Sequence, residues 1–364
     1  MQIRKLCLTV YVLCVCLCLS VQYSQAKNAN QESKECNGLV IDTTSTVPPS
    51  SFGVHDVIGA ANRLTPKKTL EAVGLVTHGR SYPLGIEISR SVPAFSPRKV
   101  DVFVIFAESF RSSANLLTFH DDFLEPGWLG VGSQIDGLSH VCMGDFCYNG
   151  LPQGEVWQHD VTASATQGPF AVAPGTRLSE GIEKLGIETV PPFVTRGLVL
   201  DMTKVFGKSR LEASSVGADS ITCQHIVQAL QRQHLRIREG DVVLFHTGWL
   251  DVAVSDPATF IAVEPGLTLS AAQYLIHKKI LAVGADNWAV EAIPNVIDTG
   301  PGGTWPGSVF PVHTLLIPKN GIYILEYINT KILVENDVSE FLFVLGQPRY
   351  TGAVQAIINP VAIK

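Results

Sequence analysis

The sequence of residues 240–246 is Gly240-Asp241-Val242-Val243-Leu244-Phe245-His246. The Gly-Asp pair is typical of a turn, and the apolar, β-branched residues that follow it predict a buried strand. Ser220 is placed to cap a helix over residues 221–234, whose apolar side chains recur on one face at helical spacing. A helix that leads through a turn into a buried strand indicates an α/β unit.

The same alternation continues toward the carboxyl terminus. A second helix is expected over residues 270–276, with Ser270 as its cap, followed by strands at 280–283 and 321–327. The first half is richer in β-type residues, with a short helix over 68–76 and a strand over 100–106. We therefore expect an α/β fold, a single domain with a mixed β-sheet, because no linker or repeat divides the chain.

The amino-terminal residues are typical of a secretory signal. A basic start precedes an apolar run over residues 6–21, and Ser24-Gln25-Ala26 matches the small-x-small pattern that signal peptidase accepts. An uncleaved anchor is the alternative, although the run is short for a spanning helix, which needs about 20 residues. We expect a signal peptide at 1–26, a flexible polar arm at 27–51 and a folded domain at 52–364. The mature protein is then secreted, extracellular and free of the membrane.

Removal of that signal leaves four cysteines, which are Cys36, Cys142, Cys147 and Cys223. Four cysteines allow three full pairings, and the sequence does not choose among them. Cys142 and Cys147 are close enough for a small loop disulfide, which an oxidising exterior preserves. A metal site at this pair is less consistent with its spacing, since no C-x-x-C pair is present.

The charge of the chain argues against some classes of partner. A formal net charge of −6 on 364 residues, with 16% charged residues, is mild and includes no basic stripe. Nucleic acid is therefore not expected as a partner, and a small-molecule substrate is.

Residues 132–140 concentrate chemistry in a short stretch. Gln134 and Asp136 lie two positions apart, so a strand would point both to one face, and the turn after Gly137 can return His140 to the same place. An amide oxygen, a carboxylate and an imidazole that converge form a plausible metal site. The alternative is that Asp136 caps a turn and His140 is a core histidine.

A second segment adds two more candidate ligands. His313 precedes an apolar stretch, and Glu326 lies late in the otherwise hydrophobic strand expected at 321–327. A buried carboxylate is costly unless it is paired or bound to metal, so Glu326 and His313 are candidates to complete a site with Asp136. The alternative is that Glu326 ends its strand facing solvent.

These residues together resemble the cyclase superfamily, a metal-dependent group that includes bacterial kynurenine formamidase and isatin hydrolase. Its motif is His-x-x-x-His-x-Asp-x-x-x-His, followed much later by a His and a Glu. Asp136 and His140 match the end of the motif, and His313 and Glu326 match the distal ligands. Further similarity at residues 56–66, 239–249 and 284–288 extends the resemblance over roughly 52–345.

The resemblance implies a swivelling β/β/α cyclase-like fold and a homo-oligomer. It also implies one divalent metal ion, zinc or manganese, held by Asp136, His313 and Glu326, with His140 as the catalytic base. The substrate would be a small cyclic or aryl amide, lactam or ester that is hydrolysed by metal-activated water. The motif's two leading histidines are replaced by Gly130 and Gln134, and the amide oxygen of Gln134 is a further candidate ligand that suits manganese.

Two other side chains are candidates for substrate binding. His120 precedes the motif and either shapes the pocket or anchors a loop, and Trp288 either lines an aromatic pocket or belongs to the core. Two other functions stay open for the same scaffold. One is a metal-dependent lyase or cyclase, and the other is a secreted matrix or interaction protein without catalysis.

Overall fold

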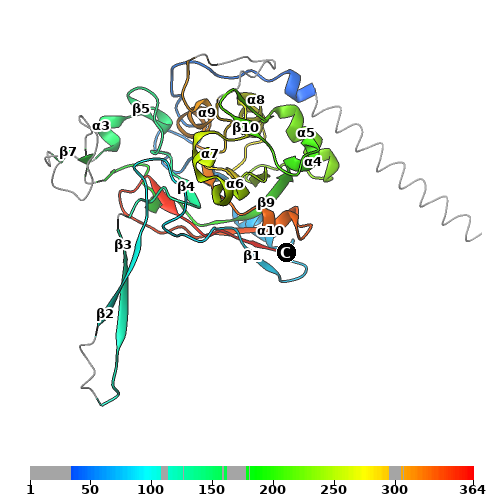
Figure 1. Ribbon diagram of the computed structural model, residues 1–364. Helices are drawn as coiled ribbons and strands as arrows, with labels where there is room; N and C mark the ends of the chain where they lie inside the picture. Colours follow the sequence, from blue (N-terminus) through cyan, green and yellow to red (C-terminus); the bar gives the residue numbers. More distant parts are fainter. Residues whose placement is uncertain are drawn as a thin grey trace, which may run out of the picture.

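A twisted mixed sheet runs through the centre of the protein, with helices packed against it (Figure 1). The computed structural model describes residues 34–107, 114–125, 127–157, 160–161, 178–179, 181–294, 305 and 307–364. Over these residues the sheet has nine strands, in spatial order β1 (Ser81–Pro83), β19 (Val361–Ile363), β17 (Glu340–Leu345), β9 (Phe193–Asp201), β13 (Val242–His246), β15 (Ala282–Ala285), β16 (Tyr323–Glu326), β4 (Gln134–Asp136) and β18 (Gln355–Ile357).

The middle of the sheet is parallel and its two sides are antiparallel. Strands β9, β13, β15 and β16 run parallel, whereas β17 and β4 pair antiparallel with β9 and β16. Every residue of β13 is buried, as its unbroken apolar run predicts for a strand covered on both faces. The α/β fold with a mixed sheet in a single domain is therefore confirmed.

Helices and short strands complete the fold. The helices are η1 (Gly59–Arg63), α2 (Pro66–Val73), η2 (Tyr148–Gly150), α3 (Gln153–Val156), η3 (Ile187–Thr189), α4 (Met202–Phe206), α5 (Cys223–Arg232), α6 (Leu250–Ser255), α7 (Pro257–Ala262), α8 (Leu269–His277), α9 (Pro311–Asn320) and α10 (Lys331–Val334). The short strand pairs are β5 (Phe146–Cys147) with β6 (Leu151–Pro152), β7 (Asp160–Val161) with β8 (Leu178–Ser179), β10 (Ala213–Ser214) with β11 (Gly217–Ala218), and β12 (Ser220–Ile221) with β14 (Gly266–Leu267).

Two helix caps differ from the sequence prediction. Helix α5 is capped by Thr222 and α8 by Thr268, each two residues from the serine that was expected to cap it. Ser220 is unavailable as a cap because β12 pairs in parallel with β14. Strand pairing has therefore moved the start of α5 two residues later, whereas α8 starts two residues earlier than expected. None of the helices in the described part of the chain is long and apolar enough to cross a membrane.

The expected flexible arm is wrong for residues 34–51. Cys36 forms a disulfide with Cys223 at the start of α5, and Leu39 and Ile41 are buried in the main core. Glu35 pairs with Lys278 after α8, and Asp42 pairs with Lys319 of α9. A polar composition predicted disorder here, but a covalent bond and two ion pairs hold the segment against the helices. The expected signal peptide, residues 1–26, lies outside the described residues.

The second disulfide joins Cys142 and Cys147, as their spacing predicted. It closes a short loop directly after His140. The structure thus selects one of the three pairings that the sequence left open.

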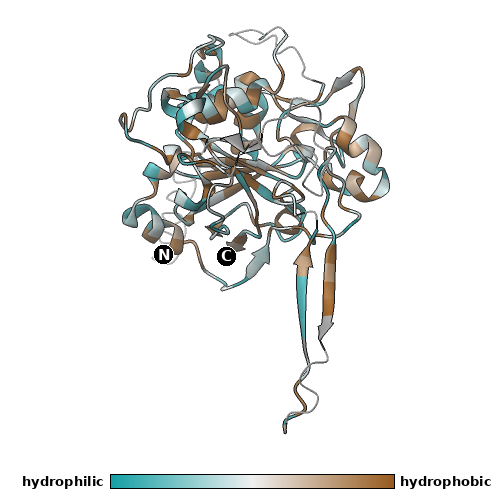
Figure 2. Cartoon of the chain, turned by 90° about the vertical axis from the view of Figure 1, so that its left-hand side faces the viewer, coloured by the Kyte–Doolittle hydropathy of each residue, from teal (hydrophilic) through white to brown (hydrophobic). Residues whose placement is uncertain are grey.

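A two-stranded hairpin projects from the body (Figures 1 and 2). It consists of β2 (Val102–Ala107) and β3 (Phe119–Leu124), which pair antiparallel. Apolar side chains are exposed on both of its faces, with Phe103 at 39%, Val104 at 51% and Ile105 at 53% of their surface. Phe103 stacks on Phe123 of the partner strand, with 5.3 Å between ring centroids.

A buried ion-pair network supports the parallel strands. Asp241, fully buried before β13, accepts hydrogen bonds from Lys68 of α2, from Arg196 of β9 at 2.8 Å and from the backbone N–H of Arg238. Burial raises the pKa of the Asp241 carboxyl, and the charges of Arg196 and Lys68 oppose that rise. The network therefore links a helix to two neighbouring strands through one carboxylate.

We expect Asp241→Ala to destabilise the protein by ~3–5 kcal/mol, because it removes the ion-pair partner of buried Lys68 and leaves buried Arg196 with Glu340 alone. Asp251→Ala, which removes an exposed pair with Lys331, is the matched control and costs less than about 1 kcal/mol. Urea unfolding followed by circular dichroism measures both. Equal midpoints for the two variants would contradict a structural role for the network.

Candidate metal centre and its pocket

The short strand β4 carries two of the expected residues to the middle of a sheet. Its antiparallel register places Gln134 opposite Glu326 of β16, and Asp136 opposite Gln355 of β18. Gln134 and Asp136 are both buried, and side chains two positions apart in a strand point to the same face. Three strands from distant parts of the sequence thus meet at one polar point.

His313 reaches the same point from the first turn of α9. Its Nε2 lies 3.3 Å from Glu326 Oε1 and 3.7 Å from Asp136 Oδ2. One ligand atom each from Asp136, His313 and Glu326 fall within 4.8 Å of one another, and all three residues are buried. We call these three residues the ligand cluster. The structure thus brings together the three residues that the sequence analysis named as candidate ligands.

Glu291 holds the imidazole of His313 from the other side. Glu291 Oε1 lies 2.5 Å from His313 Nδ1 and accepts the backbone N–H of His313 at 3.0 Å, while Oε2 accepts the N–H of Val312. A hydrogen bond at Nδ1 fixes the tautomer in which Nε2 is free to bind a metal. The same carboxylate satisfies backbone donors at the start of α9, where the helix leaves them unpaired.

Burial and the neighbouring charges shift the pKa values of the residues in the ligand cluster. Burial and the nearby Asp136 carboxylate raise the pKa of Glu326 to about 8. Burial also acts to raise the pKa of Asp136, but His140 and His313 outweigh it and hold that pKa at about 2. Burial lowers the pKa of His313, but the carboxylates of Asp136, Glu291 and Glu326 around its ring raise it well above its ordinary value. Two carboxylates and one imidazole thus lie together in a buried space with little positive charge around them.

A divalent cation fits this donor set. Asp136 Oδ2 is buried and has no hydrogen-bond partner, so one carboxylate oxygen is left for a ligand. Two carboxylates and an imidazole are donors that suit zinc or manganese, and three protein ligands leave coordination positions for water and substrate. A buried site short of positive charge supplies the electrostatic reason for such an ion.

Gln134 takes a different role from the expected one. Its Nε2 donates to Glu326 Oε2 at 2.6 Å and lies 3.4 Å from Asp136 Oδ1. The amide therefore orients the two carboxylates rather than offering its oxygen as a ligand, because carboxylates so close together need donors between them. Gln355 acts likewise and donates to Asp136 Oδ1 at 2.7 Å.

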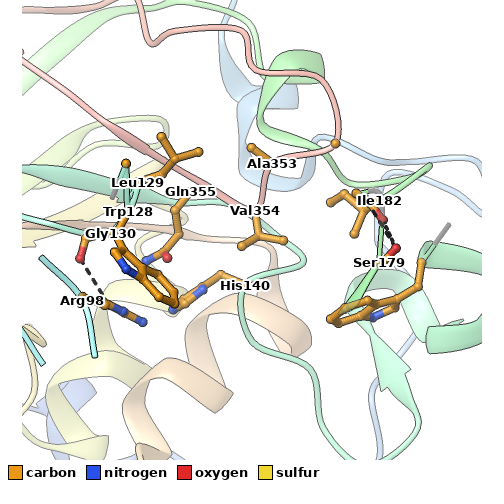
Figure 3. Close-up of a pocket in the computed structure, with 14 residues that line it drawn as sticks. Arg98, Trp128, Leu129, Gly130, His140, Ser179, Ile182, Ala353, Val354 and Gln355 are labelled. Carbon is orange, nitrogen blue, oxygen red and sulfur yellow. Dashed lines mark hydrogen bonds between the residues drawn. The ribbon is translucent and has the colours of Figure 1, made fainter. Parts of the chain in front are cut away.

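A cavity of about 540 Å³ opens beside the ligand cluster (Figure 3). His140 lines it together with Gln355, Arg98, Trp128 and Trp157. Burial lowers the pKa of His140; the charge of Asp136 opposes this effect, and the charges of His313 and Arg98 add to it. The imidazole is therefore a neutral proton acceptor near pH 7, as a general base requires.

Comparison with known proteins shows the family of this chain. The model of the family Cyclase, described as "Putative cyclase", matches residues 82–292, more than half of the chain. This chain belongs to the Cyclase family. The match includes Asp136 and His140 and ends before His313 and Glu326. A sequence comparison with curated proteins found no match.

Solved structures share the fold of this Cyclase family member. A crystal structure described as a novel cyclase is 25% identical, with a TM-score of 0.69, over 86% of this chain and 98% of that one. Isatin hydrolase A from Ralstonia solanacearum is 19% identical, with a TM-score of 0.51, over 83% and 98% of the two chains. Isatin hydrolase A from Labrenzia aggregata, bound to benzyl benzoate, is 17% identical, with a TM-score of 0.50, over 80% and 94%.

The two expected substrate-binding residues lie outside the cavity wall. His120 is exposed on β3 of the projecting hairpin, where it pairs in register with Phe106, so its expected place in the pocket is wrong within this chain. Trp288 stacks on Phe95 and meets Phe310 edge-on at 6.0 Å, and Phe310 meets His313 at 5.4 Å. Trp288 therefore reaches the ligand cluster only indirectly, through the ring of Phe310, which contacts His313.

Several buried acids and amides were missed by sequence reasoning. Glu264, Glu291 and Gln355 all lie within otherwise apolar segments, which is the signal that identified Glu326. Glu264 is buried, and burial raises its pKa well above the ordinary value, while the backbone N–H groups of Trp288 and Ala289 donate to it. Its carboxyl group thus supports the loop that carries Trp288.

We expect Glu291→Gln to weaken zinc binding by 10- to 100-fold, because His313 loses the carboxylate that orients and polarises its ring. Titration of the purified protein with zinc against a competing chelator measures this change. Glu71→Gln, on the outer surface of α2, is the control and is expected to bind as the unaltered protein does. Equal affinities for all three proteins would contradict the positioning role of Glu291.

Proposed function

We propose that this protein is a secreted, metal-dependent hydrolase of a small cyclic or aryl amide, lactam or ester. The observation that carries the proposal is the buried ligand cluster, Asp136, His313 and Glu326, next to a cavity lined by His140. Membership of the Cyclase family and the fold shared with isatin hydrolases support it. Secretion is supported by the signal-like residues 1–26.

The residues divide the chemistry among themselves. Asp136, His313 and Glu326 would hold one divalent ion, zinc or manganese, which supplies Lewis acidity for water activation and carbonyl polarisation when bound. His140, neutral and at the cavity wall, takes the proton from the attacking water and returns it to the leaving nitrogen or oxygen. Gln134 and Gln355 fix the carboxylates, and Glu291 fixes the imidazole.

The cavity favours a small aromatic substrate. Its lining is mostly apolar, with the indole rings of Trp128 and Trp157 and the side chains of Ile182 and Val354. Cyclic and aryl amides, lactams and esters combine a flat apolar body with one polar carbonyl, which matches a pocket of this composition.

The first experiment measures metal content and turnover together. We expect about one zinc or manganese per chain by elemental mass spectrometry, lost when Asp136 and His313 are both replaced by alanine. His140→Ala is expected to keep the metal and to lose turnover of isatin and aryl formamides by 100-fold or more, on the order of what a general base contributes.

The outcomes separate the hydrolase from its alternatives. A product that carries one added water identifies a hydrolase, whereas a new double bond with no water consumed identifies a lyase. Protein that takes up neither zinc nor manganese contradicts the proposal and favours an interaction protein. Near-normal turnover by His140→Ala would overturn the role of that residue alone.

We also propose that the protein is a homo-oligomer joined through the β2–β3 hairpin. A hairpin of two strands is marginally stable alone, and this one exposes apolar side chains on both faces and two open edges. A second copy offers an identical hairpin, so edge pairing about a twofold axis covers both equally.

We expect the substitutions Phe103→Asp and Ile105→Asp together to shift the protein to a monomer in analytical ultracentrifugation, with an unchanged melting temperature. Val216→Asp, at a site that is 93% exposed on the β10–β11 turn, is the matched control and is expected to leave the mass unchanged. A monomeric unaltered protein, or a hairpin variant that keeps its oligomeric mass, would refute this interface.

A further inference from the structure

Arg98 lies in the wall of the cavity, and its guanidinium forms few polar contacts with the described residues. The side chain is half-buried, and its one hydrogen bond among the described residues joins Nη1 to the carbonyl oxygen of Gly130 at a long 3.4 Å. No carboxylate of the described chain forms an ion pair with it. A guanidinium is always charged and has five N–H donors in a planar fork, so most of the donors of Arg98 have no partner among the described residues.

The position of Arg98 links it to the reacting groups. Its charge acts on both His140 and Glu326, and Figure 3 shows its guanidinium beside the Trp128 ring and close to His140. Any anionic group that Arg98 holds therefore lies within the pocket of the proposed base and the ligand cluster.

Gly130 provides the space for this arrangement. A Cβ at residue 130 would lie 2.7 Å from Gln355 Oε1 and 3.0 Å from Arg98 Nη1, so any side chain there would displace one of them. The family motif has a histidine at the position of Gly130. Here the space beside that position holds the amide of Gln355 and the guanidinium of Arg98. This glycine is needed for side-chain room and not for an unusual backbone conformation.

We propose that Arg98 binds a carboxylate of the substrate, so that the substrate class is small aryl amides, lactams or esters that carry a carboxylate. The cavity combines apolar walls with one planar cation that forms no ion pair within the described part of the chain, which matches a carboxylate on an aromatic body. The choice of the cavity as a substrate site rests on the proposed function, but the affinity of Arg98 for a carboxylate does not depend on a metal.

The test compares benzoate with benzamide, two probes of equal shape that differ in charge. Isothermal titration calorimetry at low salt is run on the full chain after treatment with a chelator, and again after loading with zinc. We expect the unaltered protein to bind benzoate at least about tenfold more tightly than benzamide in both states, as a charge-assisted bidentate pair implies.

Three variants isolate the guanidinium. Arg98→Met keeps the apolar stem and is expected to remove the preference for benzoate, whereas Arg98→Lys is expected to keep part of it. Lys99→Met removes the same charge from an exposed neighbouring side chain and is expected to keep the full preference. Melting curves confirm that each variant is folded.

The proposal is overturned by equal affinities for benzoate and benzamide in the unaltered protein, or by an Arg98→Met variant that keeps the preference. It is also overturned if benzoate binds only after zinc is added, since the carboxylate would then be a metal ligand. Failure of the proposed function leaves a different pattern. If the protein takes up no metal but still prefers benzoate in a way that depends on Arg98, the result supports the anion site and contradicts the proposed hydrolase.

Discussion

The pairing of β4 with β16 and β18 is the constraint on which the site depends. A strand of three residues has little stability alone, and it stays in register because neighbours pair with it on both sides. A slip of one residue would turn Asp136 and Gln134 to the opposite face of the sheet. The hydrogen bonds from Gln355 to Asp136 and from Gln134 to Glu326 run across these same pairings, so backbone register and side-chain contacts support each other.

Charge sets the second constraint. Asp136, Glu291 and Glu326 surround a single imidazole in a buried space, and burial together with the Asp136 carboxylate raises the pKa of Glu326. A cation in the cluster relieves the repulsion, and Arg98 extends positive charge to the cavity beside it. The ligand cluster is thus suited to a metal ion, and the adjoining cavity is suited to an anion.

The sequence predicted the strands and the ligand cluster more reliably than the supporting residues. Strand β13 was located to the residue because its apolar run has no polar interruption, and Glu326 was found because charge is costly in such a segment. Asp136 was found from its spacing with Gln134, and the resemblance to the family motif supported the choice of His313. Glu291 carried the same signal as Glu326, a charge in an apolar segment, but its role depends on contact with His313, and the role of Arg98 depends on a cavity built from distant segments; composition and spacing reveal neither. The arm at 34–51 was mispredicted because local polarity says nothing of a disulfide partner 187 residues away.

That arm also bears on how the protein is made. The segment around residues 35–42 touches the starts or ends of α5, α8 and α9, and its contact with Lys319 joins residues 277 positions apart. Because synthesis proceeds from the amino terminus, the arm has no complete docking surface until α9 has been produced. The segment is therefore made long before the helices that it contacts, and Cys36 has no partner until Cys223 has been synthesised.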